Sequence, residues 1–320
     1  MKKILITGVD GFIGYHLLSK LILKNKYKIY GIDINHTKKL KRIYNFIKNR
    51  NFLYKRLDVS NDKIFRNYLT KNNFHTIFHL ASIVGVQNYI NQTINVLNFN
   101  LKSTMTLLEV NKSKKTHIIF ASTSEVFGKN PSSYWREDSD RLTGCSSVAR
   151  WSYSVSKNVC EHLYFAYFKK YKNPFTIVRF FNAYGPKQNP IYVISKTIDL
   201  LNKNIRPLIY DSGDQIRSFT YVEDIITALI KILSNKKTFG KSYNLGNTQG
   251  LTVKKAVKII CKNMNKKNFY KNISTKKMYG KNYEDIRKRT VSGLLAKRDL
   301  NWTAKTDFNT GIKKTISFMD

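Results

Sequence analysis

The sequence has few cysteines, few acidic residues and no long apolar run, and each scarcity excludes a class of protein. Its three cysteines show neither disulfide nor metal spacing, which is typical of a reducing cytoplasm. No apolar run could span a bilayer, so we expect no membrane insertion. The six histidines show no metal spacing, so we expect no metal site. The N-terminus enters a strand pattern directly, without a visible signal peptide, and we expect a cytoplasmic protein.

Acidic residues number only 20 against 57 lysines and arginines, which gives a formal net charge of +37. Such a charge is typical of proteins that bind nucleic acid or a membrane surface. The excess is mostly lysine spread through the whole chain, and asparagine and isoleucine are also frequent. Compositional drift in an AT-rich genome explains this pattern better, so we expect no specific nucleic-acid binding. A positive field would still attract a polyanionic small substrate.

The first residues combine a strand, a glycine-rich turn and a helix. Residues 3–6 read as a short buried strand, and apolar residues at helical spacing follow the turn. Between them, Gly8, Gly11 and Gly14 have the spacing Gly-x-x-Gly-x-x-Gly. Glycine permits a tight turn and lets backbone amides approach a pyrophosphate at a helix N-terminus. In this strand–turn–helix setting the pattern predicts a dinucleotide site.

The second predicted strand, residues 28–32, ends at Asp33. An acidic residue about 20 positions after the glycines accepts hydrogen bonds from the adenosine ribose. Its charge would repel a 2′-phosphate, so we expect NAD rather than NADP as the cofactor. The alternative is that Asp33 is an ordinary loop carboxylate.

Further apolar strands alternate with helical segments, and they are predicted at residues 52–54, 76–81, 117–121 and 175–180. His79 lies on one of these apolar strands and is expected to be a core histidine. With 320 residues the chain can form one large domain or two modest ones. The alternation predicts an α/β fold with a Rossmann-type, doubly wound parallel sheet. Ligands in such sheets bind at the carboxyl ends of the strands.

Tyr153 and Lys157 precede an apolar helical run and would share one face of a helix, because they are four residues apart. A tyrosine hydroxyl titrates near ~10 and is a poor base at neutral pH. A nearby ammonium favours the phenolate and lowers that pKa. The pair therefore offers a general base. Because tyrosine and lysine are abundant in this sequence, their spacing alone is weak evidence for a catalytic pair. The other motifs of the chain provide the stronger evidence.

Polar motifs follow the predicted strands, at residues 122–128, 181–186, 215–224 and 242–247. Together with the glycine turn and the Tyr–Lys pair, they make the chain resemble the extended short-chain dehydrogenase/reductases, a family of nucleotide-sugar epimerases, dehydratases and decarboxylases. The resemblance covers essentially the whole chain. It implies an NAD-dependent enzyme with a UDP-sugar substrate. It also implies an NAD-binding domain at residues 1–182 with a return segment near 218–246, and a smaller, partly interleaved α/β substrate domain at 183–217 and 247–320.

The resemblance also assigns site residues. It implies NAD contacts from Gly8, Gly11, Phe12, Ile13, Gly14, Asp33, Asp58, Val59 and Lys157. It implies a catalytic set of Thr123, Ser124, Glu125, Tyr153, Lys157 and Arg289. It implies substrate contacts from Tyr89, Asn182, Arg217 and Tyr283, with Asn182 and Arg217 holding the nucleoside diphosphate.

The residues after Thr123 bear on the type of reaction. Dehydratases of this family carry Asp-Glu there, and the acid protonates a departing hydroxyl. This chain has Ser124-Glu125, which resembles the UDP-glucuronate decarboxylases. Their β-keto-acid intermediate loses carbon dioxide and needs no acid for a leaving hydroxyl. Residues 278–289 resemble the subgroup that makes the UDP-4-keto-pentose of the aminoarabinose lipid A pathway; UDP-xylose is the other product considered.

Three departures from that subgroup concern the substrate side. Segment 187–192 is shorter than the family's substrate loop, turn 207–210 is one residue short, and Thr290-Val291 replace Lys-Pro after Arg289. Because of these departures, the residues that contact the nucleobase are not assigned. Arg287 is the alternative to Arg289 as the active-site arginine.

The alternatives are a 4-epimerase, a 4,6-dehydratase, or a dinucleotide-fold sensor or nucleic-acid-binding protein. The oligomeric state stays open, with a homodimer among the states considered.

Overall fold

A computed structural model describes residues 1–266, 269–275, 277 and 284–318, and the chain forms two compact units. The first consists of Met1–Val126, Ser152–Arg179 and Ile226–Tyr243, and the second of Phe127–Trp151, Phe180–Ile225 and Asn244–Asp320. The main difference from the predicted domain ranges concerns residues 127–151. We predicted them in the NAD-binding domain, and the structure places them in the second unit. The assignment of a ligand to each domain stays a prediction.

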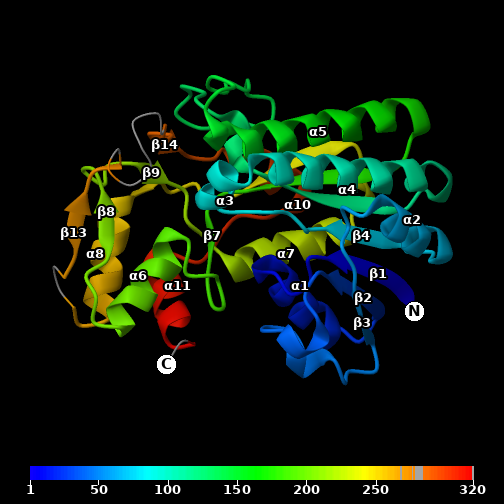
Figure 1. The fold of residues 1–320 in the computed structure, drawn as a ribbon, viewed down its shortest axis with the longest axis horizontal. Coiled ribbons are helices and arrows are strands. Elements are labelled where there is room, and N and C mark those ends of the chain that lie inside the picture. Colours follow the sequence, from blue (N-terminus) through cyan, green and yellow to red (C-terminus); the bar gives the residue numbers. More distant parts are fainter. Residues whose placement is uncertain (267–268, 276, 278–283, 319–320) are drawn as a thin grey trace. The chain divides into compact units, whose positions relative to one another are not determined.

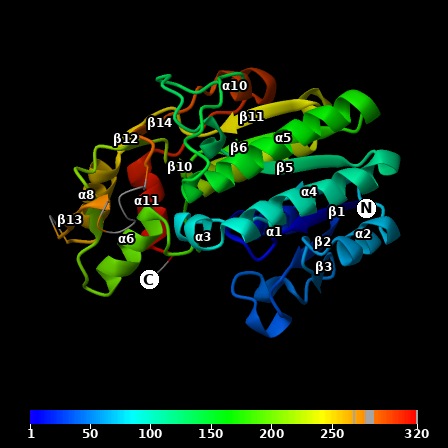
Figure 2. The same cartoon turned by 45° about the horizontal axis from the view of Figure 1, so that its top comes forward.

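A seven-stranded sheet with the order β11-β6-β5-β4-β1-β2-β3 forms the centre of the first unit. The strands are β1 (Lys2–Thr7), β2 (Tyr27–Asp33), β3 (Phe52–Arg56), β4 (Thr76–His79), β5 (His117–Thr123), β6 (Phe175–Phe180) and β11 (Lys241–Leu245). Figure 2 shows β11, β6 and β5 side by side. The strand order reverses beside β1, as in a doubly wound fold, which confirms the predicted fold class.

The parallel register brings the predicted cofactor residues to one edge of the sheet. Thr7 pairs with Ile32 on β2 and with His79 on β4, so the glycine turn and Asp33 follow neighbouring strand ends. His79 is buried, its Nδ1 lies 3.0 Å from the Thr7 hydroxyl, and burial lowers its pKa to about 3. It is a core histidine, as predicted.

Helices cover both faces of this sheet, and Figure 1 shows α2, α4 and α5 on one face and α1 on the other. They are α1 (Phe12–Leu23), α2 (Asp62–Lys71), α3 (Val86–Asn91), α4 (Thr93–Lys114), α5 (Ser152–Tyr171) and α7 (Val222–Leu233). Phe65 and Leu69, four residues apart on α2, pack into a core that also contains Leu107 of α4 and Tyr164 of α5. Helical spacing therefore places the apolar face of α2 in the core beside the sheet.

The second unit combines short strands with helices α6 (Val193–Asn202), α8 (Val253–Asn263), α10 (Leu294–Leu300) and α11 (Phe308–Ile316). Its strands are β7 (Ala183–Tyr184), β8 (Leu208–Tyr210), β9 (Ile216–Arg217), β10 (Thr220–Tyr221), β12 (Leu251–Thr252), β13 (Lys271–Ile273) and β14 (Lys288–Arg289). They form the sheets β12-β9-β14, β10-β7 and β13-β8. Ile198, Val257 and Ile312 join α6, α8 and α11 in one apolar core.

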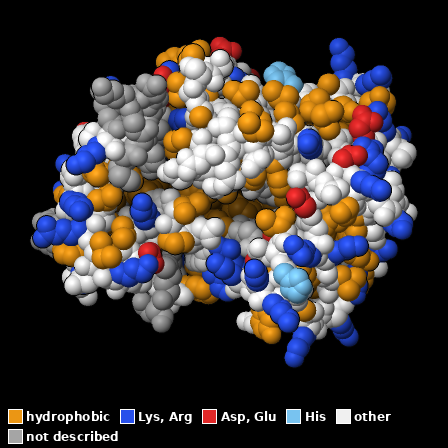
Figure 3. Space-filling view, in the orientation of Figure 1, with side chains coloured by type: hydrophobic (Ala, Val, Ile, Leu, Met, Phe, Trp, Pro, Cys, Tyr) orange, Lys and Arg blue, Asp and Glu red, His pale blue; other side chains and the backbone are white. Residues whose placement is uncertain are grey.

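No helix in the described part of the chain is long and apolar enough to cross a membrane. Figure 3 shows lysine and arginine side chains scattered over one face rather than gathered in a block.

Candidate functional site

The glycine turn between β1 and α1 is built for close approach of a ligand. Gly8 has a φ of +67°, and a Cβ there would lie 2.9 Å from the Ala81 Cα. A Cβ on Gly14 would lie 2.3 Å from the Gly8 oxygen. Both positions therefore exclude a side chain. Phe12 and Ile13 open α1, whose first turn has no acidic residue, so its free amides can take a phosphate. These residues fit the pyrophosphate of a dinucleotide.

Asp33 ends β2 beside this turn. One of its carboxylate oxygens accepts from the Asp10 amide at 3.0 Å, and the other accepts from the Ile34 amide at 2.8 Å. Burial raises the pKa of Asp33 above its ordinary value, and the backbone hydrogen bonds oppose that rise. Asp33 is thus held in place next to the glycine turn, where a ribose could reach it.

Asp58 and Val59 follow β3 at the same edge of the sheet. The Asp58 carboxylate is exposed and accepts from the Ser60 amide at 2.8 Å, while Val59 is buried. Their predicted contact with NAD stays a prediction.

Asp10, within the glycine turn, escaped the sequence analysis. Its buried carboxylate accepts from the Asn35 side chain at 3.0 Å and from the Lys41, Arg42 and Ile43 amides at 3.3, 2.9 and 3.2 Å. It fastens the loop after β2 to the turn that precedes α1. A carboxylate inside a phosphate-binding turn was the available signal, because such a charge needs partners.

Tyr153 and Lys157 both lie on α5 and are buried. The Lys157 ammonium donates to the Ala121 oxygen at 2.9 Å and lies 5.9 Å from the centre of the Tyr153 ring. Burial lowers the pKa of Lys157 to about 8, although Cys160 and Glu161 oppose this shift. The predicted pair is therefore brought together, with its lysine anchored to β5.

Tyr89, predicted to contact substrate, stacks on Tyr153 with ring centres 4.4 Å apart and planes 4° from parallel. It belongs to a small buried cluster with Val96 and Tyr153. The stacking restrains the Tyr153 ring, so Tyr89 can position the phenol as well as line a substrate site.

Thr123 ends β5, and Ser124 and Glu125 begin the 3₁₀ turn Ser124–Phe127. The Glu125 amide donates to the Thr123 hydroxyl oxygen at 3.1 Å. The Ser124 hydroxyl is buried and has no hydrogen-bond partner among the residues that the structure describes. A buried hydroxyl without a hydrogen bond destabilises the folded protein, unless a ligand or a water molecule supplies the missing partner. The three predicted residues therefore lie together at one strand end.

A buried network behind these residues was not foreseen. The Arg179 guanidinium of β6 donates to both Glu161 oxygens, at 2.9 and 2.6 Å, and the Ser122 hydroxyl donates to Glu161 at 2.5 Å. It joins α5, β5 and β6 next to Thr123. Arginine within an otherwise apolar strand was the available signal, because a buried guanidinium needs a carboxylate.

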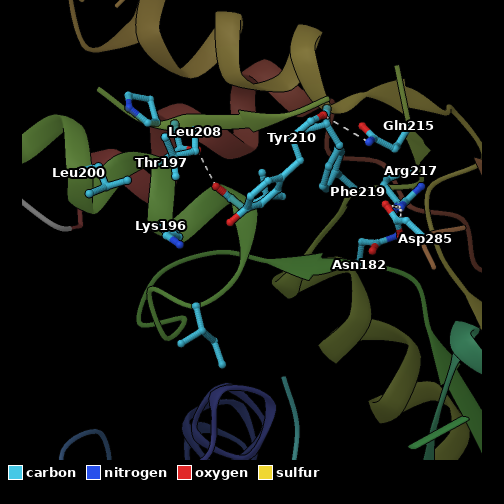
Figure 4. Close-up of a pocket in the computed structure, with 14 residues that line it drawn as sticks. Asn182, Lys196, Thr197, Leu200, Leu208, Tyr210, Gln215, Arg217, Phe219 and Asp285 are labelled. Carbon is cyan, nitrogen blue, oxygen red and sulfur yellow. Dashed lines mark hydrogen bonds and ion pairs between the residues drawn. The ribbon is translucent and has the colours of Figure 1, made fainter. Parts of the chain in front are cut away.

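Asn182 and Arg217 line a pocket in the second unit that holds about 830 Å³ of space, part of it open to solvent. Figure 4 shows Arg217 and Asp285 pointing toward one another near Asn182. Arg217 lies on β9, and its side chain is 10% exposed. Asp285 also lines the pocket, and the other lining residues are Ile191, Val193, Lys196, Thr197, Leu200, Pro207, Leu208, Tyr210, Gln215, Phe219 and Val253. The pocket's mixed lining of charged, amide and apolar side chains suits a small polar ligand.

Arg289 is the register partner of Arg217, because β14 pairs with β9 in parallel. Paired residues on neighbouring strands point to the same face, so two buried arginines lie next to each other there. Arg287 is exposed. The structure therefore brings Arg289, rather than Arg287, beside the pocket residues.

Residues 284–290, which include the described part of the C-terminal motif, contact segment 127–151 within the second unit. Glu284 accepts from the Trp151 indole at 2.9 Å and pairs with Lys129 at 2.7 Å. The Thr290 hydroxyl donates to the Ser133 oxygen, so the altered Thr290-Val291 sequence docks here. Predicted Tyr283 lies outside the described residues.

No group of three metal-ligating side chains occurs within residues 1–266, 269–275, 277 and 284–318. The predicted residues thus gather in two sets. The first unit holds the glycine turn, Asp33, Thr123, Tyr153 and Lys157, and the second holds Asn182, Arg217 and Arg289.

The chain resembles known proteins along its whole length. The family described as GDP-mannose 4,6 dehydratase matches residues 5–315. The bifunctional polymyxin resistance protein ArnA of Wigglesworthia glossinidia brevipalpis is 34% identical over 342 residues, which cover 99% of this chain and 51% of the relative. This chain therefore spans about half the length of that relative. A UDP-N-acetyl-alpha-D-glucosaminuronate decarboxylase of Bacillus cytotoxicus is 31% identical, covering 99% of this chain and 97% of the relative.

Solved structures agree with the fold. UDP-glucuronic acid 4-epimerase from Bacillus cereus, in complex with UDP-glucuronic acid and NAD, is 26% identical with a TM-score of 0.87, covering 99% of this chain and 98% of that one. A dTDP-glucose 4,6-dehydratase from Bacillus anthracis, in complex with NAD, is 22% identical with a TM-score of 0.85 over 99% of this chain and 96% of that one, and shows the fold alone.

Proposed function

Because this chain belongs to the GDP-mannose 4,6-dehydratase family of NAD-dependent nucleotide-sugar enzymes, we propose that it oxidises and decarboxylates UDP-glucuronate. The product is a UDP-4-keto-pentose, as in the aminoarabinose lipid A pathway, or UDP-xylose. The observation that carries this proposal is the juxtaposition of Arg289 and Arg217 on neighbouring strands. Two buried arginines at paired positions of neighbouring strands suit a substrate with a diphosphate and a carboxylate.

The residues of the first unit hold the cofactor and the reacting hydroxyl. Gly8, Gly11 and Gly14 admit the pyrophosphate, and Asp33 accepts from the adenosine ribose. When bound, NAD accepts a hydride. Tyr153 takes the proton from the hydroxyl on sugar carbon four, and the Lys157 ammonium favours its phenolate.

Oxidation leaves a ketone β to the carboxylate, and this arrangement permits loss of carbon dioxide. The site must hold the carboxylate until carbon dioxide leaves, and it must then supply a proton to the enolate carbon from which carbon dioxide departed. Arg289 supplies a planar fork that matches a carboxylate. The Ser124 hydroxyl, buried without a partner in the described chain, and Glu125 position the reacting group. Ser124 stands where a dehydratase needs an acid, which argues against loss of water.

The second candidate function is 4-epimerisation, and one observation favours it. The Bacillus cereus relative with the same substrate class is a 4-epimerase, with a TM-score of 0.87. An epimerase returns the hydride and leaves the substrate mass unchanged, whereas a decarboxylase releases carbon dioxide.

Product mass separates these reactions. The protein is incubated with UDP-glucuronate and NAD, and NADH absorbance and product mass are followed together. If the ketone is reduced back to UDP-xylose, we expect the product to lose the mass of carbon dioxide without accumulation of NADH. If the ketone is released, we expect NADH to accumulate and the product to lose the mass of carbon dioxide and of two hydrogens. Tyr153→Phe should lower the rate by roughly two to four orders of magnitude. An unchanged product mass would establish epimerisation instead, and loss of water would establish dehydration.

A further inference from the structure

Arg217, the arginine proposed to hold the diphosphate, already holds a carboxylate of its own chain. Its Nη2 donates to both Asp285 oxygens, each at 3.0 Å, and its Nη1 donates to the Ile216 oxygen at 2.9 Å. The Arg217 side chain is 10% exposed and that of Asp285 is 32% exposed. The pair therefore has one nearly buried cation and one carboxylate that water still reaches.

Asp285 lies inside the pocket rather than behind it. Asp285, Arg217, Asn182 and Gln215 all line the same cavity, and Figure 4 shows the Asp285 carboxylate beside the Arg217 guanidinium, near Asn182. The Ile286 amide donates to Asp285 Oδ1 at 2.8 Å, which fixes the carboxylate. Asp285 thus presents its charge where an incoming anion would approach Arg217.

A carboxylate and a phosphate use the same donors of a guanidinium group. An anion that takes Nη2 must displace Asp285 or share the donor with it, and the two negative charges repel each other. Because Asp285 is about one third exposed, water can stabilise it when it is displaced, so exchange costs little.

We propose that Asp285 is an internal competitor of the nucleoside diphosphate for Arg217 and sets the affinity of this pocket for diphosphates. This inference rests on the proposed role of Arg217 in holding the diphosphate. Removing the charge of Asp285 then tightens diphosphate binding. A carboxylate that merely orients Arg217 has the opposite consequence, because its removal loosens the guanidinium and weakens binding.

The test uses isothermal titration calorimetry of the full chain with UDP, inorganic pyrophosphate and uridine. For Asp285→Asn we expect UDP and pyrophosphate to bind about threefold to tenfold more tightly, with uridine unchanged. The gain should shrink at high salt, because a partly exposed charge is screened. In an Arg217→Gln background the same substitution should give no gain, since the contested donor is absent.

The matched control is Asp299→Asn, which removes a carboxylate from a pair with the exposed Arg298 and should leave UDP binding unchanged. Weaker or unchanged diphosphate binding in Asp285→Asn overturns the proposal, as does an equal gain for uridine. Lack of binding of both UDP and pyrophosphate in every variant overturns it too. If Asp285→Asn binds UDP more tightly but the wild-type protein does not decarboxylate UDP-glucuronate, this inference stands and the proposed reaction is wrong.

Discussion

Two arginine–carboxylate pairs, one in each unit, differ in burial. In the first unit the side chains of Arg179 and Glu161 are 2% and 5% exposed, and Ser122 completes their hydrogen bonding. In the second unit Arg217 and Asp285 are 10% and 32% exposed and face a pocket. The same chemistry therefore fixes a framework where water is excluded and offers an exchangeable contact where water enters.

The difference between the two pairs can be tested by replacing each carboxylate with the amide of the same shape. Glu161→Gln leaves the Arg179 charge buried without a counterion and should lower the free energy of unfolding by about 3–5 kcal/mol. Asp285→Asn should change it by about 1 kcal/mol or less. Urea unfolding followed by intrinsic fluorescence measures both.

If Glu161→Gln fails to fold, a Glu161→Leu/Arg179→Met double variant should recover much of the stability, because no unpaired charge remains. Equal losses in Glu161→Gln and Asp285→Asn would mean that burial does not separate the two pairs.

A second test compares Arg289 with Arg287, the two candidate active-site arginines of the second unit. Arg289→Ala should lower the rate of decarboxylation by about 10²–10³, the scale of losing one positioned donor in a transition state. Exposed Arg287→Ala should stay close to wild type. Product mass reports decarboxylation, and NAD binding measured by fluorescence should be unchanged in both. A loss in Arg287→Ala alone would transfer the role to that residue.

The smallest expected effect concerns the dependence of the reaction rate on pH, because burial lowers the pKa of Lys157 in the first unit. The pKa of Lys157 is lowered to about 8, so its ammonium is present below that pH and is lost above it. The rate of NAD reduction should fall about tenfold per pH unit above this value. UDP binding should stay flat, because arginine remains protonated.

The control for this pH profile is Lys157→Arg, which should keep its charge and flatten the decline. Folding disfavours the lysine ammonium, because its pKa lies below the unfolded value of about 10.4. Lys157 should therefore add stability as the pH rises from about 8 toward that value. A wild-type rate that keeps rising through pH 10 would contradict this role.

Local patterns predicted much of the first unit. The strand expected at residues 175–180 is observed as β6 (Phe175–Phe180), and Tyr153 and Lys157 lie on one helix as their spacing indicates. Buried strands and glycine turns are encoded within a few neighbouring residues, so a single stretch suffices to recognise them.

The rest depends on contacts between distant residues. Asp285 meets Arg217 across 68 positions, and Trp151 meets Glu284 across 133. No periodicity in either segment specifies its partner. The burial of Arg289 at the position paired with Arg217 became visible only through the pairing of β14 with β9, and its role in the reaction stays a prediction.

The chain crosses between the units five times, after residues 126, 151, 179, 225 and 243. The outer strand β11 (Lys241–Leu245) completes the sheet of the first unit beside β6. During synthesis on the ribosome, this sheet therefore cannot close until about three quarters of the chain has emerged. A nascent chain halted before β11 would expose the edge of β6, a surface for chaperones to cover and for neighbouring nascent chains to invade.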